Sequence, residues 1–337
     1  MQGVLEGAIN IAEKATGKDI DGDGDVGLRA AKVARRGEPT ESPVNQSYLP
    51  SIPDGFATPF YYSSLTNLGV NYLVPLDCVK PYLKPDVVAA KLDGMALVQY
   101  NFQVYTGNYA SPDTAKPEEW FPSGASVTQE LEFSILVVPK SAKRVPKVTF
   151  EQYMLGEEQS KLMGFLRLHV PCDAPLAIAA GVALYGEPKF QTTFRVNLAS
   201  RNPGRDPNSF APTQARSEWS TKMGFRIEDP ENAKESICTA IVDVTGLRAL
   251  PGNPSPITEY GEHDGKRIAC RWNILGPMDT YFLSEDEAYR VQLTYGDSPH
   301  QMKKDMEVLL KGARPRAVQF FESSPAAING RAYYPEF

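Results

Sequence analysis

The sequence predicts a mainly β protein, with an antiparallel sheet or barrel and a few helices at its periphery. Apolar and polar residues alternate in several segments, which is the period of a strand with one buried face. Few segments with helical spacing lie between them, which favours antiparallel over parallel pairing of the strands. The alternating segments are residues 98–104, 131–137, 190–198, 268–274 and 289–295.

The N-terminal part of the chain, residues 1–45, differs from the remainder. It opens with apolar residues at helical spacing, which predict a short amphipathic helix. An Asp- and Gly-rich run and a basic stretch follow, and two prolines then indicate a linker. We therefore expect one compact domain over residues 46–337.

The Asp- and Gly-rich run resembles the first part of a calcium-binding EF-hand loop. Asp19, Asp21 and Asp23 occupy the first, third and fifth ligand positions, and a glycine follows at the sixth. The twelfth position, where a bidentate glutamate belongs, is Ala30. The run therefore predicts weak Ca²⁺ binding at the three aspartates, with a degenerate loop or a flexible acidic linker as the alternative.

Two short helices are expected in the compact domain. Asp77 is positioned to cap a helix that ends before Pro85. Near the C-terminus, Ser298 supplies an N-cap, a proline follows at the first helical position, and Gln301 completes a capping box. Apolar residues then recur on one helical face, and Gly312 ends the helix.

The composition excludes several classes of partner. Of the 337 residues, 42% are hydrophobic and 23% are charged, as in an ordinary globular protein. A net charge of −6 provides no basic footprint for nucleic acid. No run of about 18 apolar residues occurs, so no membrane-spanning segment is predicted.

The cysteines and the start of the chain predict a cytoplasmic protein. Cys78, Cys172, Cys238 and Cys270 are irregularly spaced and form no CxxC pair. Such spacing favours reduced, mostly buried thiols over a disulfide frame or a zinc site, so no metal is expected in the compact domain. The first residues include acidic side chains and lack the basic start and apolar core of a signal peptide.

Lys189 is the residue with the clearest physical reason to be reactive. It follows the run from Ala174 to Leu184, which holds no charged or strongly polar side chain. Poor solvation disfavours an ammonium and lowers its pKa, which leaves free amine near neutral pH. A free amine attacks ketones and aldehydes to give Schiff bases. The alternative is an ordinary surface lysine that forms an ion pair with Glu187.

Around this lysine the chain resembles the acetoacetate decarboxylase family. Asp173, an Ala-Ile-Ala run, Gly181 and the Pro188-Lys189 pair follow the order and spacing of the family's motif. The stretch around Glu130 resembles the strand that presents the family's active-site glutamate. The resemblance implies an antiparallel β-barrel or cone with a few peripheral helices, a Schiff-base role for Lys189, a catalytic role for Glu130, and assembly into homo-oligomers.

The chain also departs from the family's pattern. Phe190 stands where authentic decarboxylases carry a second lysine, and Asn101 stands where a further glutamate is expected. An unbroken strand beyond Lys189 would point Arg195 the same way as the lysine, where it could hold a substrate carboxylate. Tyr185 could line the pocket, with a buried core tyrosine as the alternative. The predicted substrate-binding residues are Arg195, Asn101, Phe190 and Tyr185.

The predicted function is a lyase that needs no cofactor and acts on a small or medium oxo acid through a Schiff base on Lys189. In the family's chemistry the iminium accepts the electrons released as carbon dioxide leaves. Because charged residues of the family are missing here, aldolase or dehydratase chemistry stays open beside decarboxylation. A non-catalytic small-molecule binding protein on the same fold is the alternative from another class. For Glu130, the alternative is a solvated strand face that it shares with Glu132.

Overall fold

The computed structural model describes most of the predicted compact domain. The described residues are 49–53, 56, 58–107, 127–197, 222–323 and 326–335. The helix, loop and linker predicted for residues 1–45 lie outside them, and so does the calcium site predicted at Asp19, Asp21 and Asp23. All six candidate site residues of the compact domain lie within the described ranges.

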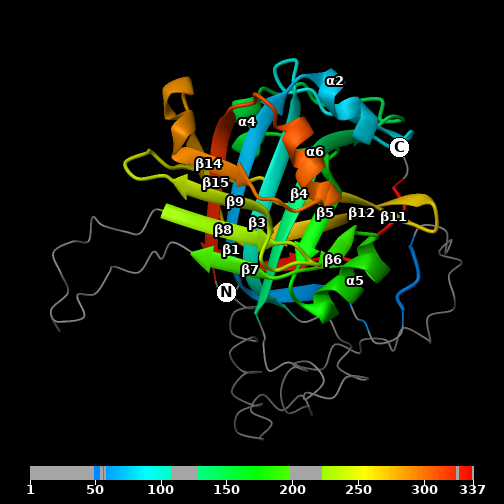
Figure 1. Cartoon of the computed structure of the whole chain (residues 1–337). Helices are drawn as coiled ribbons and strands as arrows, with labels where there is room; N and C mark the ends of the chain where they lie inside the picture. The colour runs from blue at the N-terminus through cyan, green and yellow to red at the C-terminus, as the bar shows by residue number, and fades with distance from the viewer. Residues whose placement is uncertain are drawn as a thin grey trace, which may run out of the picture. The chain divides into compact units, whose positions relative to one another are not determined.

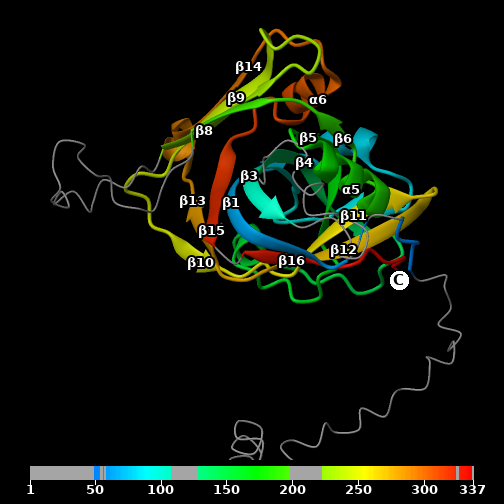
Figure 2. The same cartoon turned by 90° about the horizontal axis from the view of Figure 1, so that it is seen from below.

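Seven strands close into a barrel. In chain order they are β1 (Phe60–Val74), β3 (Ala96–Gly107), β4 (Thr128–Pro139), β5 (Gly164–Cys172), β11 (Ile257–His263), β12 (Lys266–Ile274) and β16 (Ala327–Asn329). Around the ring the order is β1, β16, β12, β11, β5, β4 and β3, which pairs again with β1 (Figures 1 and 2). The mainly β prediction is confirmed, with one correction: β11 and β5 pair in parallel, so the barrel is mixed.

Further strands extend this sheet, and four others form a second one. The extensions are β2 (Val87–Ala89), β6 (Lys189–Gln191), β10 (Leu250–Gly252), β13 (Met278–Phe282) and β15 (Pro315–Ser323). The second, antiparallel sheet consists of β7 (Phe194–Asn197), β8 (Lys222–Glu228), β9 (Ser236–Asp243) and β14 (Val291–Tyr295). It lies across the outside of the barrel (Figure 1), where Phe225 stacks on Phe102 with ring centroids 4.8 Å apart.

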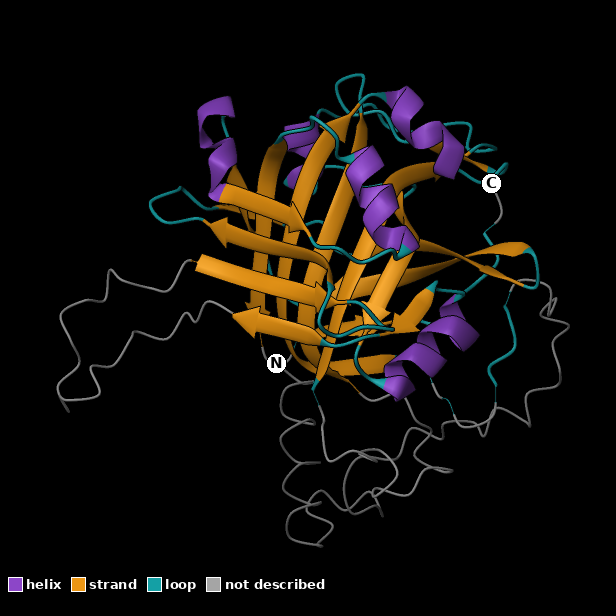
Figure 3. Cartoon of the chain, in the orientation of Figure 1, coloured by secondary structure: helices purple, strands orange, loops and turns teal. Residues whose placement is uncertain are grey.

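Helices are few and peripheral (Figure 3). They are α2 (Leu76–Val79), α4 (Phe150–Met154), α5 (Pro175–Tyr185) and α6 (Gln301–Leu309), with 3₁₀ turns η2 (Lys80–Tyr82) and η3 (Glu285–Arg290). Of the helices described, none is long and apolar enough to cross a membrane.

Both predicted helices form, but Asp77 and Ser298 are not their N-caps. Asp77 lies inside α2, whose N-cap is a proline. The N-cap of α6 is His300, whose Nδ1 accepts a hydrogen bond from the Met302 N–H at 3.2 Å. Ser298 has other partners, because its hydroxyl donates to Asp229 and accepts from the His300 N–H.

Two of the predicted strands are shorter than their alternating patterns. The chain leaves the barrel sheet after Gln191 and enters the second sheet at Phe194, so residues 190–198 do not form one strand. The crossing is fixed at Thr192, whose hydroxyl donates to the Glu228 carbonyl at 2.6 Å. Tyr289, predicted to start the last alternating strand, lies in η3 and is exposed.

The thiol prediction is confirmed. All four cysteines are free, with Cys78 exposed and Cys172, Cys238 and Cys270 buried. Burial raises the pKa of Cys238 to about 12, so this thiol stays protonated at neutral pH. Among the described residues, no group of three or more His, Cys, Asp or Glu side chains is arranged to hold a metal ion.

The barrel strands have two buried faces. On β3, Tyr100 and Phe102 point outward into the core beneath the second sheet. The residues that alternate with them, Gln99, Asn101 and Gln103, are also buried and point into the barrel. The polar side of the alternating pattern is therefore the inner wall of the barrel, and a polar site is built inside it.

Candidate active site

Helix α5 and strand β6 carry Lys189 into the barrel. The helix packs against β5, β11 and β12, and Gly186 ends it with a left-handed φ of 61°. Strand β6 then pairs in parallel with β5, with Lys189 opposite Val170. Gly181 of the helix lies directly under the lysine, because a Cβ there would be 2.2 Å from Glu187 Oε2 and 2.6 Å from Lys189 Cδ. Only glycine leaves room for both side chains.

The amine of Lys189 is enclosed by carboxylates. Its Nζ lies 2.7 Å from Glu130 Oε2 and 3.0 Å from Glu187 Oε2, and it donates to the Ala177 carbonyl at 3.4 Å. Only 6% of the Lys189 side chain and 3% of the Glu130 side chain are exposed. The surface position that the alternatives gave to Lys189 and the solvated position they gave to Glu130 are therefore wrong, whereas the ion pair of Lys189 with Glu187 is present.

A second buried cation, Arg167 of β5, lies beside this pair. Its guanidinium contacts Glu132, Glu187 and Glu259, and the contact to Glu187 measures 2.8 Å. Glu187 joins the two cations, since it also contacts Lys189. The cluster formed by Lys189, Arg167, Glu130, Glu132, Glu187 and Glu259 thus holds four carboxyl groups and two basic groups, and we call it the charged cluster.

Neutral side chains of β3 complete the hydrogen bonding of two of these carboxyl groups. Tyr105 donates its hydroxyl to Glu130 Oε2 at 3.0 Å. Gln103 donates to Glu132 Oε1 at 3.0 Å, and Asn101 donates to Glu132 Oε2 at 3.3 Å. The predicted site residue Asn101 therefore reaches the charged cluster through Glu132.

The carboxyl groups of the charged cluster differ in acidity. Burial raises the pKa of Glu130, against the opposing effect of Lys189 and with the help of the nearby Glu187 and Glu132. Burial likewise raises the pKa of Glu132, although Arg167 opposes it. Burial acts on Glu187 as well, but Lys189 and Arg167 outweigh it and lower the pKa of Glu187. Glu187 is thus the firmly ionised partner, and Glu130 is the carboxyl group suited to take up a proton.

A small cavity lies over the amine. Its volume is about 20 Å³, enough for about one water molecule. Besides the charged cluster, Tyr185 and Trp272 line it. Glu187 Oε2 makes no hydrogen bond beyond its ion pair with Lys189, and four further buried atoms of the lining have no hydrogen-bond partner: Gln103 Oε1, Arg167 Nε, Trp272 Nε1 and Asn329 Oδ1. These atoms are available to a bound ligand.

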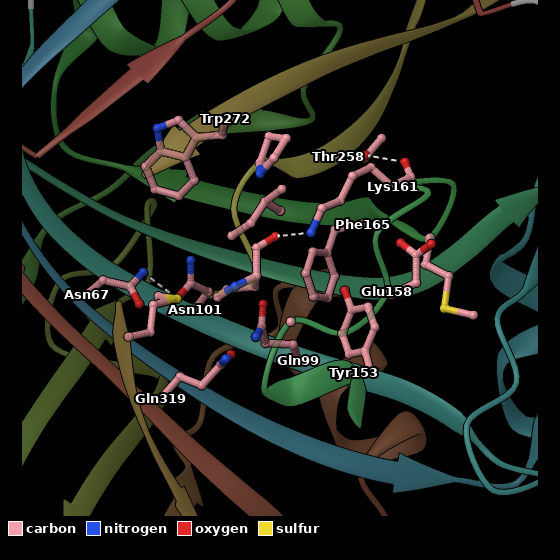
Figure 4. A pocket seen from close by; sticks show the side chains of 16 residues that line it. Asn67, Gln99, Asn101, Tyr153, Glu158, Lys161, Phe165, Thr258, Trp272 and Gln319 are labelled. Carbon is pink, nitrogen blue, oxygen red and sulfur yellow. Dashed lines mark hydrogen bonds between the residues drawn. The ribbon is translucent and has the colours of Figure 1, made fainter. Parts of the chain in front are cut away.

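A second chamber, of about 40 Å³, shares Trp272 with the first (Figure 4). Amide side chains dominate its polar lining: Asn67, Gln99, Asn101 and Gln319. At its edge, Lys161 donates to the Pro254 carbonyl at 2.9 Å. The interior of the barrel therefore offers a charged chamber around Lys189 and an amide-lined chamber beside it.

The four predicted substrate-binding residues divide into two groups. Tyr185 lines the Lys189 cavity and donates its hydroxyl to the Gly330 carbonyl at 3.1 Å, and Asn101 lines the second chamber. Phe190 and Arg195 line neither. Phe190 follows Lys189 on the strand and so faces the other way, where its ring centroid lies 4.5 Å from that of His300.

The predicted placement of Arg195 beside Lys189 is wrong. Its side chain is 75% exposed, and its Nε lies 2.7 Å from Glu228 Oε1. The physical reason is the break after Gln191, which moves Arg195 into the second sheet. Its predicted role in holding a substrate carboxylate has no support from this position.

Sequence reasoning missed Arg167, Glu259 and Tyr105. Arg167 stands between two leucines, and Glu259 stands between a threonine and a tyrosine in another β-rich stretch. A charged residue in the middle of such a strand was the available signal, because it needs a partner if the strand is buried on both faces. The alternation alone did not show that the polar face is enclosed.

The fold and the site together define a class: β-barrel proteins that bury a lysine amine among carboxyl groups. No family model matches this chain, and no curated protein matches its sequence. Solved structures are similar to it at low sequence identity. An acetoacetate decarboxylase-like enzyme from Sphingomonas wittichii RW1 is 14% identical with a TM-score of 0.52, over 85% of this chain and 94% of that one.

Two further structures agree. An acetoacetate decarboxylase structure gives a TM-score of 0.51 at 13% identity, over 84% of this chain and 93% of that one. The enduracididine biosynthesis enzyme MppR, with HEPES buffer bound, gives 0.51 at 12% identity, over 83% and 87%. The chain therefore has the acetoacetate decarboxylase-like fold.

Proposed function

We propose that Lys189 forms a Schiff base with the carbonyl group of a small oxo compound, and that Glu130 moves the protons of this reaction. The observation that carries the proposal is the 2.7 Å contact between Lys189 Nζ and Glu130 Oε2, two buried side chains that line one cavity. A buried carboxyl group with a raised pKa is the acceptor that an ammonium needs in order to become a free amine.

The proton movements agree with this geometry. Glu130 takes a proton from the ammonium, and the neutral amine attacks the carbonyl carbon to give a carbinolamine. Glu130 then returns the proton to the departing hydroxyl group, which leaves as water. The products are an iminium on Lys189 and a carboxylate on Glu130, two opposite charges that stabilise each other. The Tyr105 hydroxyl, bound to Glu130 Oε2, holds the carboxyl group in place.

The reaction beyond the iminium is of the acetoacetate decarboxylase-like type. MppR has been solved in complex with pyruvate and with the condensation product of pyruvate and imidazole 4-carboxaldehyde. These ligands support oxo compounds as the substrate class and condensation beside decarboxylation as the chemistry. The oxo acids predicted from the sequence are the first compounds to test.

Reduction with borohydride tests the proposal. The full chain is incubated with acetone, acetaldehyde, pyruvate or acetoacetate, reduced, and mapped by peptide mass spectrometry. We expect an adduct on Lys189 that Lys189→Ala abolishes. Lys222→Met, which removes a lysine whose side chain is 68% exposed, should leave the adduct intact. No adduct with any of these carbonyl compounds overturns the proposal.

The alternative function is non-catalytic binding of a small molecule. Two observations favour it: Glu130 and Glu187 both hold the amine, and the cavity admits only about one water molecule. A carbonyl compound that raises the melting temperature and yet leaves no adduct after reduction would establish this alternative.

A further inference from the structure

We infer that the Lys189 site selects uncharged carbonyl compounds over oxo acids, that is, compounds with no carboxylate on the carbon α or β to the carbonyl group. The inference rests on the proposed function, because it concerns which carbonyl compound the amine of Lys189 accepts. It departs from the oxo acid predicted from the sequence. Its basis is the charge of the groups that surround the amine.

The charged cluster already contains more acid than base. The side chains of its four glutamates are each at most 10% exposed, and those of Lys189 and Arg167 are each 6% exposed. Every one of these carboxyl groups contacts one of the two cations. The raised pKa values of Glu130 and Glu132 have the same origin, since a buried site resists further negative charge.

Among the described residues of this cavity, both basic groups are already paired with carboxyl groups, although Arg167 Nε makes no hydrogen bond. Arg167 already faces three carboxyl groups, and Lys189 is the group that reacts. Arg195, predicted to serve this purpose, lies exposed in the second sheet. A carboxylate next to the carbonyl group would therefore have to share a cation that already faces three carboxyl groups.

The charge balance of imine formation points the same way. An uncharged carbonyl compound replaces the ammonium by an iminium and releases water, so the cluster keeps its positive charge at Lys189. An oxo acid adds one negative charge within a few ångströms of Glu130, Glu132 and Glu187. In a buried site such a contact costs far more than in water, or it forces the uptake of a proton.

The unpartnered polar atoms of the neutral side chains fit an uncharged ligand. Trp272 Nε1 is a neutral donor, and Gln103 Oε1 and Asn329 Oδ1 are neutral acceptors. The adjacent chamber continues this lining with the amides of Asn67 and Asn101 (Figure 4). Hydroxyl and amide groups satisfy such atoms without adding charge.

An uncharged substrate also limits the step that the iminium can undergo. It has no carboxylate next to the carbonyl group to lose as carbon dioxide. The step open to it is removal of a proton from the carbon α to the iminium, with Glu130 as the base. The C–H electron pair then forms the enamine double bond, and the iminium nitrogen becomes neutral. An enamine is the nucleophile of an aldol-type condensation, so the charge of the site favours this reaction class.

A matched pair of ligands tests the inference. Pyruvate and pyruvamide have the same size and an activated ketone, and they differ in one negative charge. We expect borohydride to trap pyruvamide on Lys189 at least about tenfold faster than pyruvate, because one pKa unit of like-charge repulsion is already a factor of ten. Glu132→Gln removes one carboxyl group and should bring the ratio closer to one by speeding the reaction with pyruvate.

The outcomes separate the two proposals. Equal or faster trapping of pyruvate on Lys189 overturns the inference and leaves the Schiff-base proposal standing. No adduct with either ligand overturns the Schiff-base proposal itself. Should Glu132→Gln fail to fold, Glu259→Gln removes a different carboxyl group that contacts Arg167 and provides the same comparison. A ratio unchanged in a folded variant also contradicts the inference.

Discussion

Among single residues, two carboxyl groups with different pKa values determine the proposed reactivity of Lys189. Glu187 contacts both Lys189 and Arg167, and these two cations keep its pKa low in spite of burial. Glu130 contacts only one of them and has a raised pKa. In the proposed reaction, Glu187 therefore fixes the position of the amine, and Glu130 exchanges protons with it.

Replacing Glu130 by glutamine separates these roles. Glutamine keeps the shape of the side chain but cannot carry the proton. We expect Glu130→Gln to slow reductive trapping by about 10²-fold, the lower range for loss of a general acid–base group, while the adduct stays on Lys189. The exposed Glu262→Gln is the matched control and should react like the unaltered chain. An unchanged trapping rate in Glu130→Gln would show that another group moves the proton.

Replacing Gly181 by alanine tests the close packing beneath Lys189. A methyl group there would collide with Glu187 and Lys189, so Gly181→Ala should displace the amine and cost about 1–3 kcal/mol in the free energy of unfolding. We expect this variant to form less of the borohydride-reduced adduct on Lys189 as well, which peptide mapping measures. At Gly330 a Cβ would meet nothing closer than 3.5 Å, so Gly330→Ala is the control. Full trapping by Gly181→Ala would contradict the geometry.

At the scale of elements, the break between β6 and β7 determines which arginine lies in the charged cluster with Lys189. The sequence favoured Arg195, which an unbroken strand would have carried to the lysine. The strand instead ends where Thr192 binds the backbone of Glu228, and Arg167 of β5 takes the place beside Lys189. A local pattern cannot reveal this exchange, because it depends on which sheet each strand joins.

The two arginines should therefore behave differently when replaced by methionine. Arg195→Met removes an exposed side chain and should change the free energy of unfolding by less than about 1 kcal/mol, with trapping on Lys189 unchanged. Arg167→Met leaves the buried Glu132 and Glu259 without a cation and Glu187 with Lys189 alone, and it should cost about 3–5 kcal/mol. Urea unfolding measures both. A loss of trapping in a folded Arg195→Met protein would restore its predicted role.

The elements that could be predicted are those specified by local patterns. The alternation in residues 98–104 and 131–137 predicted β3 and β4, and the apolar run before Lys189 marked what proved to be α5. The same alternation left open whether the polar faces of these strands are exposed to solvent or enclosed inside the barrel. Closure of the barrel answers that question, and closure depends on pairings between distant strands, such as the parallel pair of β5 and β11.

Across the whole molecule, the barrel encloses a polar interior whose charge varies with pH. Burial raises the pKa of Glu130 and Glu132 above that of a glutamate in the unfolded chain. The folded state then binds these protons more tightly than the unfolded state does. The stability that the two groups contribute is fully present below the ordinary glutamate pKa of about 4.3, and it is lost as pH rises through the raised values.

Glu132→Gln removes one of these titrations. We expect the free energy of unfolding of the unaltered chain, minus that of Glu132→Gln, to become more negative as pH rises from about 5 to about 9. Urea unfolding at several pH values measures this difference, in which the other titrating groups largely cancel. A difference that is constant, or that rises with pH, would mean that the pKa of Glu132 is not raised in the folded protein.

The pH dependence of acetylation shows whether Lys189 reacts as a free amine near neutral pH. The full chain is acetylated with acetic anhydride between about pH 6 and pH 10, and the initial rate at Lys189 is measured by peptide mass spectrometry against that at the exposed Lys222. We predict that Lys189 is acetylated rapidly already near neutral pH, so that the ratio of its rate to that of Lys222 falls as pH rises. A rate at Lys189 that keeps rising tenfold per pH unit alongside Lys222 would contradict the account.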